Sequence, residues 1–187
     1  MNMSAIDRLL TNYKRQVTLP WSNNISGKQR IWFAVYPPAD ERRVRAHLPQ
    51  FETLTLEASH GWMSVDLTRI LPEFLATHKY REQIFEQPQH LKAGVELEGR
   101  AAALVSAACV NETADAQSVV AVVGLSSMFD FMRVSSLIER IEDSVRGRLL
   151  VFFPGEHAGN IYRFMDARDG FNYMAIPITS AESFINP

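Results

Sequence analysis

The chain has 187 residues, of which 47% are hydrophobic, and it carries a formal net charge of −2 with a pI of about 6.2. This length and hydrophobic content suit a single domain that buries its own core, and the charge balance argues against a dedicated nucleic-acid-binding surface. The one cysteine, Cys109, excludes an internal disulfide, and no apolar run approaches the roughly 18 residues of a membrane span, so we expect a cytoplasmic protein.

Two helices and two strands are predicted in the first third of the chain. Apolar residues at helical spacing between Ile6 and Val17 predict a helix, with Ser4 as its N-cap. The run from Arg30 to Tyr36 predicts a strand, and Asp40 can start the helix that follows. A second strand is predicted over residues 62–67.

The middle of the chain is predicted to be mostly helical. Residues 68–111 carry apolar stripes, interrupted by Pro88, and could form a helical insertion or cap within the single domain 1–187. The stretch Ser118–Val123 predicts a third strand, and an amphipathic helix is predicted from Phe131 to Val145.

A continuous apolar run, Leu149–Phe153, predicts a fourth strand that is buried on both faces of a parallel sheet. The Gly/Pro-rich residues 154–160 predict that this strand ends and that a loop begins. A last strand is predicted over Phe171–Pro177, where the proline favours an edge position or a strand end.

Strands that alternate with helices are typical of α/β proteins. We therefore expect a three-layer Rossmann-like or P-loop-like domain with a mostly parallel sheet of about five strands flanked by helices. Open sheets of this kind usually bind their partners at the carboxyl ends of the strands. The predicted loop after Phe153 is therefore the expected location of the functional site.

The motifs of nucleotide-binding and hydrolytic enzymes are missing from the sequence. Residues Ser26–Gln29 look like the end of a Walker A loop, but they precede the first strand and lack the Ser/Thr after the lysine. No Gly-x-Gly-x-x-Gly and no Gly-x-Ser-x-Gly is present. Residues Gly124–Ser127 could hold an anion at a helix start, or they could form an ordinary capped turn. The histidines show no metal-ligand spacing, so neither a metal nor a cofactor is expected.

Charged side chains near the predicted strand ends allow more than one interpretation. Asp66, Glu156 and His157 could meet at one rim and resemble an acid–base site, or they could be solvated loop residues and helix caps. Three arginines of the second helix form either a solvated face or a patch for a partner, and they are Arg42, Arg43 and Arg45.

Aromatic residues are concentrated near the end of the chain, where they either pack in the core or form an exposed patch for a protein partner. Arg163 and Arg168 are expected to form surface pairs with Asp166 and Asp169, with an anion clamp as the alternative. The aromatic residues are Tyr162, Phe164, Phe171 and Tyr173.

Three segments of the C-terminal third share the pattern of a known family. They read Phe-Phe-Pro-Gly-Glu at 152–156, Gly-Asn-Ile-Tyr-Arg-Phe at 159–164 and Asp-Gly-Phe-Asn-Tyr-Met-Ala at 169–175. Together they resemble the C-terminal signature of BrxB, a small component of BREX phage-resistance systems. Two further segments resemble the family, so that the resemblance spans roughly residues 1–178; they are Val35–Glu41 and Val122–Leu125 with Phe129 and Arg133.

The resemblance implies a non-catalytic, cytoplasmic component of a BREX defence system against bacteriophages. BrxB-type proteins look like adaptors that bind PglZ, an alkaline-phosphatase-like protein, in a complex that also contains a methyltransferase and a AAA-type ATPase. The resemblance supplies no catalytic residues that can be carried over to this chain. No cofactor is expected, and a homodimer is an additional expectation. We expect the contact surface to include Glu156, His157, Asn160, Tyr162 and Arg163, together with Arg42, Arg43 and Arg45.

The sequence is also compatible with other functions. The first is a nucleotide-binding or hydrolytic enzyme that uses the rim of Asp66, Glu156 and His157. The second is a subunit that contacts DNA through the three arginines, although the acidic pI counts against this role and sequence-specific DNA binding is not expected. A nucleotide- or nucleic-acid-binding regulatory subunit of the same complex is the alternative to the adaptor.

Overall fold

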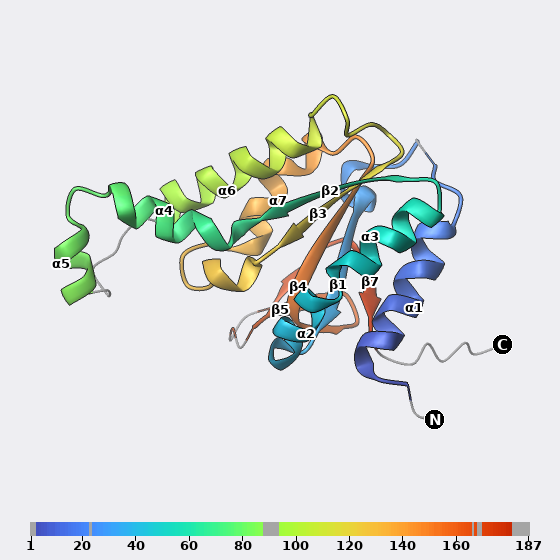
Figure 1. Cartoon of the computed structure of the whole chain (residues 1–187), viewed down its shortest axis with the longest axis horizontal. Helices are drawn as coiled ribbons and strands as arrows, with labels where there is room; N and C mark the ends of the chain where they lie inside the picture. Colours follow the sequence, from blue (N-terminus) through green and yellow to red (C-terminus); the bar gives the residue numbers. More distant parts are fainter. Residues whose placement is uncertain (1–2, 23, 88–93, 166, 168–169, 181–187) are drawn as a thin grey trace.

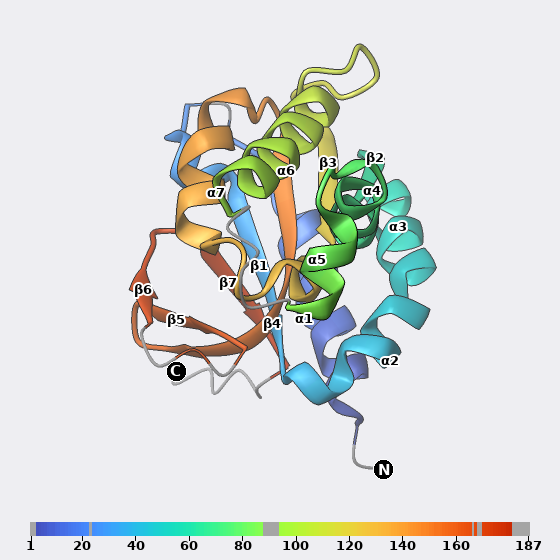
Figure 2. The same ribbon diagram turned by 90° about the vertical axis from the view of Figure 1, so that its left-hand side faces the viewer.

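The computed structural model describes residues 3–22, 24–87, 94–165, 167 and 170–180. Helices cover both faces of one seven-stranded sheet, which gives a three-layer arrangement (Figures 1 and 2). The strand order is β2-β3-β4-β1-β7, and β5 and β6 extend the sheet from β4. The strands are β1 (Ile31–Tyr36), β2 (Gly61–Asp66), β3 (Ser118–Val123), β4 (Arg148–Ala158), β5 (Ile161–Phe164), β6 (Phe171–Asn172) and β7 (Ile176–Thr179).

The sheet contains both parallel and antiparallel pairs. β1 lies parallel to β4 and β7, and β3 lies parallel to β2 and β4. β5 is antiparallel to β4 and to β6. The predicted α/β class is confirmed, but the sheet has more strands than predicted. Its order is neither 3-2-1-4-5-6 nor 2-1-3-4-5, the two common doubly wound orders, so a Rossmann-like topology is not confirmed.

The helices form two layers. Figure 1 shows α1, α2 and α3 on one side of the sheet, and α4, α6 and α7 on the other, with α5 at the far end of the molecule. The α-helices are α1 (Ala5–Thr18), α2 (Glu41–Ala46), α3 (Leu48–Glu57), α4 (Ile70–Thr77), α5 (Arg81–Glu86), α6 (Gly94–Cys109) and α7 (Val134–Ile141). Short 3₁₀ helices span Gly27–Arg30, Pro38–Asp40, Leu67–Arg69, Leu125–Met128 and Glu142–Ser144.

Each face of the sheet buries its own hydrophobic core, because successive side chains of a strand point to opposite faces. Phe33, Val151 and Phe153 belong to the core beneath α4, α6 and α7. Trp32 and Phe152 belong to the core beneath α1, α2 and α3. The continuous apolar sequences of β1, β3 and β4 follow from this double burial.

Local sequence signals define several ends of these elements. The backbone N–H of Asp7 donates to the Ser4 hydroxyl over 3.1 Å, and the Asp7 carboxylate accepts in return from Ser4, so the predicted N-cap of α1 is confirmed as a capping box. Pro177 lies in β7 at one edge of the sheet, as predicted, where the missing N–H breaks no central ladder.

Three sequence-based boundaries are wrong. The predicted loop 154–160 is largely strand, because β4 continues to Ala158 and β5 supplies new hydrogen-bond partners. The predicted last strand, 171–177, is divided between β6 and β7, which pair with different neighbours. The predicted helix 131–145 is shorter, since α7 spans Val134–Ile141 and continues only as a 3₁₀ turn.

Some predicted features fall on residues outside the described part of the chain. They are the helix break at Pro88, one of the histidines, His90, and the surface pairs that involve Asp166, Arg168 and Asp169.

Candidate functional site

The carboxyl end of the sheet carries the segments that the sequence analysis singled out. The parallel strands β1, β2 and β3 end at this edge. The second half of β4 extends beyond it and forms a hairpin with β5 (Figure 2). Ligands and partners of open α/β sheets usually bind at this edge.

The hairpin is built by close backbone packing. A Cβ atom on Gly155 would lie 2.1 Å from the Arg163 carbonyl oxygen, so the two strands can approach only because residue 155 is glycine. Gly159 adopts a φ of +61° in the turn, a conformation that favours glycine. The Met165 N–H donates to the Pro154 carbonyl over 2.8 Å at the base of the hairpin. The Pro-Gly pair therefore allows β4 to pair with β5 and does not end the strand.

Two of the predicted contact residues face each other on the exposed side of the hairpin. Glu156 lies opposite Arg163 in the β4–β5 ladder, and their side chains form an ion pair of 3.5 Å. Both side chains are at least half exposed, so the pair contributes only about 0–1 kcal/mol to stability. Asn160 is exposed in the turn beside them. These three side chains are accessible to a partner.

Two other predicted contact residues support the hairpin from beneath. The Tyr162 side chain is 1% exposed, and its hydroxyl donates to the Ala175 carbonyl over 2.8 Å. Burial raises the pKa of Tyr162 above its usual range. His157 packs on Tyr162 with ring centroids 4.4 Å apart, and burial lowers the pKa of His157 below 6.5. Tyr162 therefore shapes the surface without being part of it.

The aromatic residues of the C-terminal segment mostly pack in the core. The ring centroid of Phe33 lies 5.2 Å from that of Phe153 and 4.7 Å from that of Tyr162. Phe164 and Tyr173 are each buried, whereas Phe171 is half-buried. Of the two sequence-based interpretations, core packing holds for the buried members of this group.

A groove of about 670 Å³ opens next to the hairpin. It lies between the start of α6, the loop before α7 and the β5–β6 side of the sheet. A Cβ on Gly94 would lie 2.8 Å from the Phe131 carbonyl oxygen, which shows how closely α6 approaches that loop. The lining is largely apolar, with Val95, Phe129, Phe131, Met132, Phe164 and Phe171 among its residues.

Charged groups border the apolar lining of the groove. Asp130 and Arg133 lie in its wall, and Asp130 adopts a φ of +67°, which is unusual for a residue other than glycine. Glu98 also lines the groove, where it pairs with Arg140 of α7 over 2.9 Å. Sequence reasoning missed this groove, although Phe129, Arg133 and the aromatic C-terminal residues had each been noted separately.

The three arginines of α2 do not form one patch. Arg45 pairs with Asp66 at the end of β2 over 2.7 Å, whereas Arg43 contacts Asp40 at 3.5 Å. Arg42 is exposed. Burial opposes ionisation of Asp66, but hydrogen bonds from Arg45 and Thr68 outweigh it and lower the pKa of that carboxyl.

The predicted rim of Asp66, Glu156 and His157 is not assembled. Asp66 is level with Val123 on β3, and Val122 is level with Val151 on β4. Glu156 therefore lies two strands away from Asp66 and four residues further along, which is roughly 13 Å in the strand direction alone. Each of the three side chains has a separate partner, so the structure provides no shared acid–base site among them.

The turn after β3 has the contacts of an ordinary capped turn. Gly124 adopts a φ of +77° and starts a 3₁₀ helix instead of an α-helix. The Ser127 hydroxyl donates to the Gly124 carbonyl over 2.7 Å. A Cβ on Gly124 would collide with Thr68 and Asp66, which explains the glycine without an anion.

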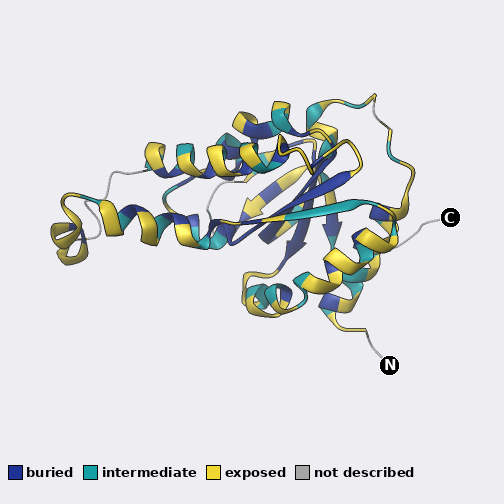
Figure 3. Ribbon diagram, turned by 45° about the horizontal axis from the view of Figure 1, so that its top comes forward, coloured by how far each residue is buried: buried dark blue, intermediate teal, exposed yellow. Residues whose placement is uncertain are grey.

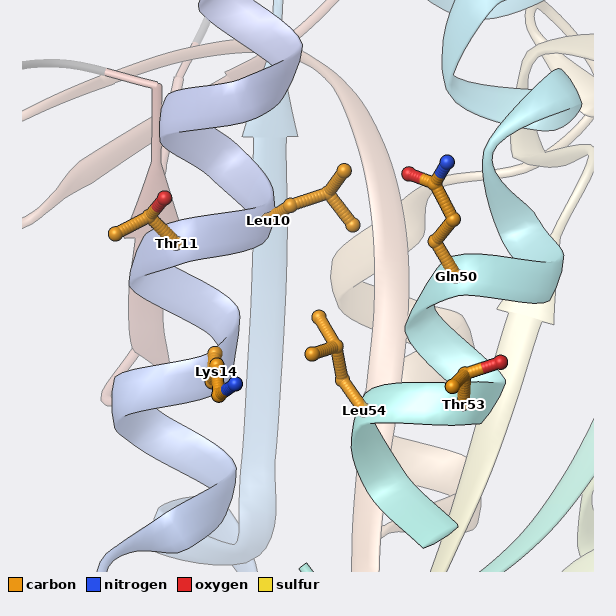
Figure 4. Close-up of a pocket in the computed structure, with 6 residues that line it drawn as sticks. All are labelled: Leu10, Thr11, Lys14, Gln50, Thr53 and Leu54. Atoms are coloured by element: carbon orange, nitrogen blue, oxygen red, sulfur yellow. The ribbon is translucent and has the colours of Figure 1, made fainter. Parts of the chain in front are cut away.

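A second, smaller groove lies on the opposite face of the sheet. It has a volume of about 320 Å³ between α1 and α3, where Leu10 and Leu54 point toward one another (Figure 4). Lys14 and Glu57 form an exposed contact of 3.9 Å between the same helices. This groove is remote from the hairpin.

Two features are absent from the described residues. No helix there is long and apolar enough to cross a membrane. No three His, Cys, Asp or Glu side chains in this part of the chain come together as metal ligands would.

Comparison with known families gives a match over more than half of the chain. The family model described as BREX protein BrxB matches residues 63–178, a stretch that runs from β2 into β7. It includes the hairpin and the large groove but excludes α1 and α3 with the smaller one. No curated protein and no solved structure matches the chain significantly.

Proposed function

The chain belongs to the BrxB family and is a component of a BREX phage-defence system, and from this premise we propose that it is a non-catalytic adaptor that binds the PglZ-like component of that system. The proposed contact surface is the large groove together with the exposed side of the β4–β5 hairpin. Other BREX components, such as the methyltransferase and the AAA-type ATPase, would bind to the complex of this chain with the PglZ-like protein.

The observation that carries the proposal is the large apolar groove beside the hairpin. Val95 at its mouth is 81% exposed, although valine is a residue that proteins usually bury. Apolar side chains in a concave surface with a charged border are the features of a protein-binding patch. The groove also lies entirely within the stretch matched by the family model.

The chemistry of the surface suits recognition better than catalysis. Its apolar lining can receive an aromatic or aliphatic side chain of a partner, which is how most interface energy is obtained. The Glu156–Arg163 pair on the hairpin can exchange its weak internal contact for contacts with charged residues of the partner.

The first experiment is co-expression with the PglZ-like protein encoded in the same BREX system, followed by size-exclusion chromatography with light scattering. We expect one shared peak whose mass gives the stoichiometry. Separate peaks, with both proteins folded, would contradict the proposed partner.

A charged substitution in the groove tests the proposed surface. Val95→Glu changes an exposed side chain, so the fold should persist while the shared peak is lost. Val110→Glu is the matched control, because Val110 is also an exposed valine but does not line the groove. Retention of the complex by Val95→Glu would exclude the groove as the contact surface.

Charge reversal tests the hairpin in the same assay. Combined Glu156→Arg and Arg163→Glu substitutions preserve an internal ion pair but exchange the positions of the two charges. We expect the unfolding temperature to be unchanged and complex formation to weaken. An unchanged complex would restrict the contact surface to the groove.

A nucleotide-binding regulatory role is the second candidate, and one observation favours it. A terminal guanidinium nitrogen of Arg45 is buried without a hydrogen-bond partner, beside the carboxyl end of β2. A phosphate group would supply the missing acceptor only if the Arg45 side chain moved, because this nitrogen has no accessible surface. Calorimetric titration with ATP, GTP and dinucleotides tests this role, and the absence of both heat and a thermal shift would remove it.

A further inference from the structure

We draw no further inference here: the strongest candidate, the outer edge of β2, a strand that is half-buried or exposed at every residue except Val65 (Figure 3), carries none, because nothing in the described part of the chain shows what covers this edge.

Discussion

The two halves of β4 differ in what surrounds them: the first is part of the core of the sheet, and the second belongs to the proposed contact surface. The first half, Arg148–Phe153, lies parallel between β1 and β3 and is buried throughout. The second half, Gly155–Ala158, pairs antiparallel with β5 and becomes exposed at Glu156. The change occurs at Pro154, which is still level with Tyr36 of β1 while its carbonyl already accepts from Met165.

The difference follows from what covers each half. Helices pack on both faces of the first half, so every side chain must be apolar or fully satisfied. The second half extends past the parallel array, and only the face that carries Tyr162 and Phe164 is buried. Substitutions in the first half should therefore affect stability, and exposed substitutions in the second half should affect recognition.

The largest expected effect is in the buried half. Phe153→Ala removes a fully buried ring that contacts Phe33, Tyr162 and Phe164. We expect a loss of about 3–5 kcal/mol in the free energy of unfolding, measured by urea denaturation. Phe85→Ala, at a side chain that is 66% exposed, should change it little. Similar losses for both variants would contradict the assigned burial.

The next effect is at the point where the strand changes partner. Gly155→Ala forces a Cβ into the Arg163 carbonyl, so we expect the hairpin to shift and stability to fall by about 1–3 kcal/mol. Gly99→Ala is the control, because nothing lies within 4 Å of a Cβ there and alanine favours a helix. If thermal unfolding shows Gly155→Ala to be as stable as the wild type, the close strand approach is incorrect.

A smaller effect is expected at the buried support of the hairpin. Tyr162→Phe leaves the Ala175 carbonyl without its hydrogen bond, which should cost about 1–2 kcal/mol in chemical denaturation. Tyr80→Phe, at an exposed tyrosine, should have no measurable effect. Unchanged stability of Tyr162→Phe would show that water replaces the hydroxyl.

The smallest effect depends on pH. Burial lowers the pKa of His157 in the folded state below its unfolded value of 6.5, so the unfolded state binds a proton first as the pH falls. The His157 contribution to stability is therefore fully present above about pH 6.5 and declines between that value and the lower folded pKa. The unfolding temperatures of wild type and His157→Gln should diverge less at about pH 5 than at about pH 8. A constant difference would mean that His157 is not buried enough to shift its pKa.

Elements that several local sequence signals indicate together could be predicted from the sequence. The predicted third strand, Ser118–Val123, agrees with β3. A short continuous apolar run that ends at a glycine is typical of a strand buried on both faces. The Ser4 cap was recognisable because its hydrogen bonds are local. The C-terminal motifs indicated the family that the comparison then showed.

The remaining features depend on contacts between distant residues. The Pro-Gly pair at 154–155 predicts the end of a strand. The pairing with β5 shows instead that β4 continues and changes its partner strand there. The Arg45–Asp66 ion pair joins residues that no local pattern connects, and the groove combines residues from α6, the loop before α7 and β5.

The amino-acid sequence by itself determined which segments are buried, because the spacing of apolar residues shows whether a segment is buried on one face or on both. It also determined the ends that depend on local hydrogen bonds, such as the start of α1. Only the tertiary structure decided the strand order, the second half of β4 and the groove beside it. These features arise from backbone pairing and helix placement between segments far apart in the chain, where the free energy depends on which surfaces meet and not on the local pattern of either one.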